Sequence, residues 1–252
     1  MNFRILLVAI IANCAVVSAQ KNTNVEGSKF EFKEIVRHDA SPVESQGRTG
    51  TCWSFSALSF LESEIMRVNK TDKPIVLSEM FIVRKAYEAK AKKYIRMDGR
   101  TNFGQGGAFH DIPYVIKNYG IVPQNVYTGL KKKSDTYNHS EMFNQLNEIV
   151  SNAKSEGKGI QQSWVESYNK VLDENIGELP ETFKFKGEKY TSQSFYKSLG
   201  IDMNDYLSIT SFTNHPMYSK CMLEIPDNWL WDESYNVSVD EMYETVLHAL
   251  KS

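Results

Sequence analysis

The chain has 252 residues, of which 41% are hydrophobic and 24% are charged, with 29 basic and 31 acidic side chains. This composition excludes a disordered chain, a collagen and a coiled coil, because it is apolar enough to form a core and mixes both signs of charge. The formal net charge of −2 gives no general attraction for a phosphate backbone, so no nucleic-acid partner is expected.

The first nineteen residues predict a secretory signal peptide. Arg4 supplies one positive charge before the apolar run at 5–11, and residues 17–19 are the small residues that a signal peptidase requires. The run is too short for a transmembrane helix, which needs about 20 apolar residues. We therefore expect removal of residues 1–19 and export to the periplasm or the extracellular space, with no integral membrane segment afterwards. A lipid anchor at Cys14 is the weaker alternative.

Apolar residues spaced three and four apart predict a mainly helical mature chain. The predicted helices cover residues 51–68, 78–98, 109–119, 142–149, 164–176 and 240–250. Ser78 is a candidate N-cap and Gly120 a candidate C-cap. Residues 183–187 alternate between apolar and polar side chains, which predicts a short strand and a turn. Residues 192–225 are expected to mix a short helix with loops.

Cys52 is the candidate nucleophile, at the start of the first predicted helix in the segment QGRTGTCWSFS at 46–56. The positive end of a helix dipole stabilises a thiolate over a thiol. The amide of Gln46 can fold back to donate a hydrogen bond to an oxyanion, with the Cys52 N–H as a second donor. The competing interpretation makes Cys52 a buried small hydrophobe beside Trp53. Cys221, the other cysteine of the mature chain, is either free or disulfide-bonded.

The segment at 46–56 resembles the surroundings of the catalytic cysteine in papain-superfamily peptidases. Residues 77–80 are similar to the start of that superfamily's second helix. Gly106 and Gly107 are similar to its paired glycines, which bind the substrate backbone. The segments 104–111, 119–123, 225–229 and 240–242 resemble the bleomycin hydrolase and aminopeptidase C family more closely, in its secreted bacterial type.

This resemblance implies an α+β papain-like fold, present mainly as its helical half with a helical insertion, the β-rich half being largely missing. The parts expected are a signal peptide at 1–19, a helical domain carrying the catalytic cysteine at 20–125, and the insertion with a cleft-bordering segment at 126–252. The implied activity is a cysteine aminopeptidase acting through an acyl-enzyme, with no metal or other cofactor. Peptide substrates and assembly into a homo-hexamer are implied as partners.

A peptidase of this kind needs a histidine and an asparagine beside its cysteine. The histidine is expected at 182–202, where the sequence has none. His215 precedes Asn228-Trp229 in the papain order, but the resemblance places such a segment before the catalytic histidine, so we interpret it as a loop or a cleft wall. We expect the catalytic histidine and asparagine beyond Ser252. The alternative is a non-catalytic pseudo-peptidase that binds peptide or a partner.

The remaining histidines have simpler interpretations. His110 is expected either on a helix face or at the border of the cleft. His139 is expected to face solvent, and His248 to belong to the amphipathic face of the last helix.

Overall fold

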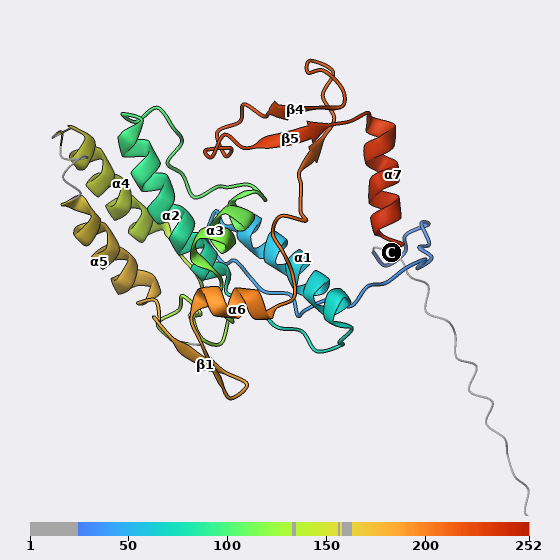
Figure 1. The fold of residues 1–252 in the computed structure, drawn as a ribbon, viewed down its shortest axis with the longest axis horizontal. Helices are drawn as coiled ribbons and strands as arrows, with labels where there is room; N and C mark the ends of the chain where they lie inside the picture. Colours follow the sequence, from blue (N-terminus) through green and yellow to red (C-terminus); the bar gives the residue numbers. More distant parts are fainter. Residues whose placement is uncertain (1–24, 133–134, 156, 158–162, 252) are drawn as a thin grey trace, which may run out of the picture. The chain divides into compact units, whose positions relative to one another are not determined.

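The computed structural model describes residues 25–132, 135–155, 157 and 163–251. The predicted signal peptide and Cys14 therefore lie outside the described residues. The chain divides into two compact units, one up to Arg37 and the other from His38 onwards. The described part of the first unit contains no helix or strand, so every element named below belongs to the second unit (Figure 1).

The predicted helices are confirmed within the described residues. They are α1 (Cys52–Asn69), α2 (Glu79–Arg96), α3 (Asp111–Tyr119), α4 (Ser140–Ser155), α5 (Trp164–Ile176), α6 (Ser192–Ser198) and α7 (Val239–Ala249). Ser78 caps α2, since its hydroxyl accepts a hydrogen bond of 3.1 Å from the Phe81 N–H. Gly120 ends α3 with a φ of +78°, a backbone conformation that side-chain-bearing residues rarely adopt.

Two small sheets accompany the helices. The predicted strand at 183–187 is confirmed as the antiparallel hairpin of β1 (Phe183–Phe185) and β2 (Glu188–Tyr190). The second sheet was not predicted, and its strands are β3 (Ile209–Thr210), β4 (Ser219–Met222) and β5 (Glu233–Asn236). The β5 strand lies in the middle, parallel to β3 and antiparallel to β4. The described residues therefore form mainly helices with a few short strands, which agrees with the predicted α+β class.

The core lies between the helices. Leu58, Leu61 and Ile65 form the buried stripe of α1, which packs against α2 and α3. The α4 and α5 helices lie side by side and pack against α2 (Figure 1). One cluster of buried side chains runs from Trp53 to Met203 and so includes residues on both sides of position 125. The domain boundary expected there stays a prediction.

The α7 helix has no buried residue. Its apolar side chains at 239, 243 and 246 are about half exposed or more, as is the C-cap Leu250, whereas Met242 and Leu247 are partly buried and His248 is exposed. The helix expected over this segment is therefore present, and most of its apolar side chains remain largely exposed. In that same part of the chain, no helix is both long and apolar enough to cross a bilayer.

The prediction for His139 is wrong. This residue is only 2% exposed, because Asn138 pairs with Arg48 and draws the chain onto the loop that precedes α1. Its Nδ1 lies 3.4 Å from the Tyr87 hydroxyl, and its Nε2 has no hydrogen-bond partner among the described residues. Burial lowers the pKa of His139 to about 4. The polar neighbours Asn138 and Ser140 concealed this burial in the sequence.

Candidate active site

Cys52 is the first residue of α1, and its side chain is exposed. The alternative that Cys52 is a buried hydrophobe is therefore wrong. Cys221, in β4, is buried, and neither cysteine forms a disulfide. Among the described residues, Cys52 thus supplies the accessible thiol, at the helix end where backbone N–H groups lack intrahelical acceptors.

The loop before Cys52 is fixed by contacts with a distant segment. Arg48 donates its N–H to the Tyr137 carbonyl at 2.8 Å, and Arg48 and Asn138 form an isolated β-bridge. Gly47 has a φ of +58°, and a Cβ there would lie 2.5 Å from the Tyr137 carbonyl oxygen. Only glycine fits such a position without displacing the neighbouring segment around Tyr137. The backbone that leads into Cys52 is consequently well defined.

Gln46, the predicted oxyanion donor, uses one of its amide N–H groups inside this loop. Its Nε2 donates to the Thr49 carbonyl at 2.6 Å, and the Thr49 hydroxyl donates back to the Gln46 carbonyl at 2.9 Å. A side-chain amide has two N–H donors, so one remains for another acceptor. The role of Gln46 in binding an oxyanion stays a prediction.

Gln105 joins the predicted glycine segment to the start of α1. Its side-chain oxygen accepts from the Gly50 N–H at 2.8 Å, and its backbone carbonyl accepts from the Trp53 indole N–H at 2.9 Å. The nucleophile candidate and the predicted backbone-binding glycines therefore lie on adjoining segments. The sequence contained Gln105 within its glycine pattern but gave no sign of this joining role.

The space around Gly106 and Gly107 leaves no room for a side chain at either position. A Cβ at Gly106 would lie 2.6 Å from an Asp227 carboxylate oxygen. At Gly107 it would lie 2.5 Å from Asp111 Oδ2 and 2.8 Å from the Trp53 ring. Neither glycine has a positive φ, so space rather than backbone conformation excludes a side chain here. Their role in binding a peptide backbone stays a prediction.

Replacing Gly107 by alanine is expected to destabilise the fold by about 1–3 kcal/mol, because the new methyl group collides with a buried carboxylate and a buried indole. Gly104→Ala is the matched control, since its nearest neighbours are 3.3 Å or more away and belong to the Asn102 side chain. Urea unfolding followed by tryptophan fluorescence measures both. Equal stability of the two variants would contradict the crowding explanation.

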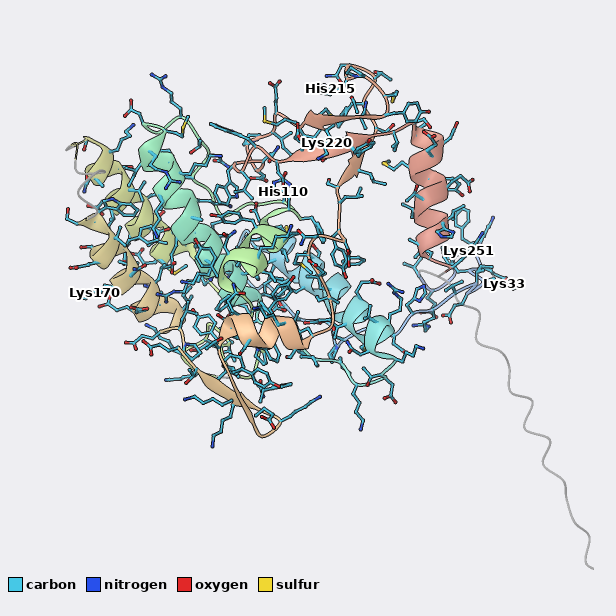
Figure 2. All side chains as sticks on the ribbon, in the orientation of Figure 1. Lys33, His110, Lys170, His215, Lys220 and Lys251 are labelled. Carbon is cyan, nitrogen blue, oxygen red and sulfur yellow. The ribbon has the colours of Figure 1, made fainter. Side chains whose placement is uncertain are left out.

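No histidine hydrogen-bonds to the Cys52 thiol, although all five lie within the described residues. His110 precedes α3, with its Nε2 3.7 Å from Asp111 Oδ1, and burial lowers its pKa. His215 lies in the loop between β3 and β4 (Figure 2), where Asn236 Nδ2 donates to the His215 carbonyl at 3.1 Å.

Asn228, the residue that would orient His215 in a papain-like order, is engaged elsewhere. Its Nδ2 donates to the Leu223 and Asp232 carbonyls, both at 2.9 Å, and its Oδ1 accepts from the Asp232 N–H at 3.0 Å. The Asn228 side chain thus stabilises the turn in which it lies. The neighbouring Trp229 donates its indole N–H to Asp111 Oδ2 at 2.9 Å.

Comparison with known proteins decides the family. The model of the papain family of cysteine proteases matches residues 28–199. The chain belongs to this family. It is 25% identical over 195 residues to bleomycin hydrolase of Rattus norvegicus, a match covering 66% of this chain and 42% of that protein. It is also 25% identical over 205 residues to aminopeptidase C of Lactococcus lactis, covering 67% and 45%.

A crystal structure of PepW from Lactobacillus rhamnosis HN001 has the same fold, with a TM-score of 0.69 at 19% identity. The match covers 86% of this chain and 58% of that one. The predicted papain-like fold is therefore confirmed. The matches span less than half the length of the bleomycin hydrolase and aminopeptidase C relatives named above.

Proposed function

We propose that this chain carries the nucleophile and the peptide-binding segment of a thiol peptidase that removes residues from the N-termini of peptides. The observation that carries this proposal is the exposed Cys52 at the start of α1, joined through Gln105 to the glycine segment. Membership of the papain family supports thiol chemistry. The aminopeptidase C relatives support action at the N-terminus.

In the proposed reaction the Cys52 thiolate attacks the carbonyl carbon of the scissile peptide bond. An S–C bond forms, and the carbonyl electron pair moves to oxygen, where the Cys52 N–H and the second N–H of Gln46 stabilise it. The C–N bond then breaks and the departing amine takes a proton, leaving an acyl-enzyme that water hydrolyses. The histidine predicted beyond Ser252 is expected to move these protons, with the asparagine predicted there orienting its ring.

The non-catalytic alternative is favoured by two observations. None of the five histidines, all of them described, hydrogen-bonds to the Cys52 thiol, and Asn228 is engaged within its own turn. A protein with this arrangement could bind peptides beside Cys52 without turning them over.

Alkylation of the thiol tests the proposal. A dipeptidyl chloromethyl ketone is expected to label Cys52 at least tenfold faster than chloroacetone, which has the same chloromethyl ketone group and no peptide. Cys221 should stay unlabelled because it is buried. Peptide mapping by mass spectrometry assigns the site, with Cys52→Ser and Cys221→Ser as matched controls. Equal labelling of the two cysteines, or no preference for the peptidyl reagent, would overturn the proposal.

Turnover of an aminoacyl amide, measured on a chain that extends far enough to include the predicted histidine and asparagine, separates the two candidate functions. Turnover that is lost in Cys52→Ser supports the peptidase. Preferential labelling of Cys52 without turnover supports the peptide-binding alternative for this chain.

We also propose that the mature protein begins at Gln20, is exported, and assembles into a homo-hexamer. The pattern of residues 1–19 supports export, and the family resemblance supports the assembly. N-terminal sequencing and light scattering of the exported protein measure these two properties directly.

A further inference from the structure

Lys90 is a buried lysine on α2 that the proposed reaction does not use. It is 1% exposed, and its ammonium group donates to the carbonyl of Gly106 and, at 3.4 Å, to that of Gly104. Its Nζ also lies 3.9 Å from Asp111 Oδ2. Two of its contacts are thus to the backbone of the segment that is predicted to bind peptide.

The ammonium group also lies near the nucleophile loop. Its Nζ is 5.3 Å from the centre of the Trp53 ring and 5.8 Å from that of Trp229, distances at which a cation is attracted to an aromatic face. Trp53 directly follows Cys52 and donates to the Gln105 carbonyl. Lys90 therefore contacts both the helix start that carries the thiol and the glycine segment beside it.

The contact with Gly106 fixes the direction of the next N–H group. In a trans peptide the C=O of one residue and the N–H of the next point in opposite directions, and the described chain has no cis peptide. Because the Gly106 carbonyl points to Lys90, the Gly107 N–H points away from it. Within the described residues, no acceptor is paired with this N–H. Its hydrogen-bonding capacity is therefore unused within the described chain.

We propose that Lys90 is a positioning residue for peptide binding: by holding the Gly106 carbonyl, it presents the Gly107 N–H to the substrate backbone beside Cys52. This inference rests on the proposed function and adds a residue to it. Burial of the charge fits the role, because a lysine in this position is held by the carbonyls and by Asp111 rather than by water.

The test compares the 252-residue chain with the variant Lys90→Met/Asp111→Asn, which removes both buried charges together. Alkylation of Cys52 by the dipeptidyl chloromethyl ketone forms the S–C bond and releases chloride, and the thiol proton goes to solvent. Its saturation kinetics separate the inhibition constant KI from the limiting rate kinact. We expect KI to rise about tenfold, while kinact and the rate with chloroacetone stay within twofold.

Two controls isolate the Lys90 contact. Asp111→Asn keeps the ammonium group and should keep KI within threefold of the unmodified chain. Lys93→Met makes the same substitution one helical turn later, where the side chain donates to the Leu230 carbonyl at 3.1 Å instead of to the glycine segment. It should leave KI unchanged.

The outcomes separate this inference from the proposed function. If the unmodified chain shows no saturation with the peptidyl reagent, the proposed function fails, and this inference fails with it. If saturation is present and the double variant keeps the original KI, only the role of Lys90 is overturned.

A second measurement does not depend on the folding of any variant. In the unmodified chain with ¹⁵N-labelled glycine, alkylation by the peptidyl reagent should shift the Gly107 amide resonance, and alkylation by chloroacetone should not. An unmoved Gly107 resonance after peptidyl alkylation would overturn the inference.

Discussion

Replacing Glu79 by glutamine is expected to flatten the pH dependence of the unfolding free energy between about pH 4.5 and pH 8 and to stabilise the chain at the alkaline end. Glu79, the first residue of α2, is 3% exposed, and its Oε2 has no hydrogen-bond partner among the described residues. Burial, and to a smaller extent the nearby Glu62 carboxylate, raise its pKa from 4.5 to about 8.

The sign of the effect follows from which state holds the proton. Between pH 4.5 and pH 8 the folded chain keeps a proton on Glu79 that the unfolded chain has released. The stability that this bound proton contributes is therefore fully present below the pKa of Glu79 in the unfolded chain. It is lost as the pH rises through the pKa of Glu79 in the folded chain. The slope is about 1.4 kcal/mol for each pH unit. Glutamine has no proton to lose, so this contribution disappears.

Urea unfolding at a series of pH values measures this difference, and the quantity to plot is the stability of Glu79→Gln minus that of the unmodified chain. Glu166→Gln is the matched control, since it removes one carboxylate from the exposed face of α5. Its curve should run parallel to that of the unmodified chain. A difference for Glu79→Gln that does not change with pH would show that the buried carboxylate is not protonated in the folded state.

Much of the helical structure could be predicted because it is encoded locally. The spacing of Leu58, Leu61 and Ile65 identifies the buried face of α1 without any knowledge of its neighbours. Ser78 marks the start of α2 through its own hydroxyl. Such signals depend on residues a few positions apart, so one sequence is enough to read them.

The second sheet could not be predicted for the opposite reason. The β3 strand has two residues, too few to show an alternating pattern, and its pairing joins Ile209 to Tyr235. Asn236 anchors the sheet, since its buried amide binds both the N–H and the carbonyl of Phe212. No sequence pattern near Phe212 predicts these hydrogen bonds.

The same distinction applies to the candidate site. Cys52 and Gly107 could be named because their neighbours form a pattern typical of a family. Lys90 could not, because it lies among other lysines on α2 that resemble a solvated helix face, and its partners are backbone carbonyls, which every residue possesses. The burial of a charge is decided by the segments that fold over it.

Lys90→Met alone is expected to cost about 3–5 kcal/mol of stability at pH 8, because it leaves the Asp111 carboxylate buried without a cation. Burial raises the pKa of Asp111 to about 6 even though Lys90 opposes the shift. Without the ammonium group, the carboxyl should take up a proton at a still higher pH. The cost should therefore be smaller at pH 5, where the carboxyl is neutral, than at pH 8.

The variant Lys90→Met/Asp111→Asn decides whether the stability lost in Lys90→Met comes mainly from the unpaired charge or from the lost packing. If the unpaired carboxylate causes the loss, the double variant should be more stable than Lys90→Met at pH 8, and its stability relative to the unmodified chain should change little with pH. Trp229 can still donate to the asparagine oxygen, so that hydrogen bond survives the second substitution. Equal, pH-independent losses in the single and double variants would instead assign the cost to the missing lysine contacts, and the Asp111 carboxylate would carry no penalty of its own.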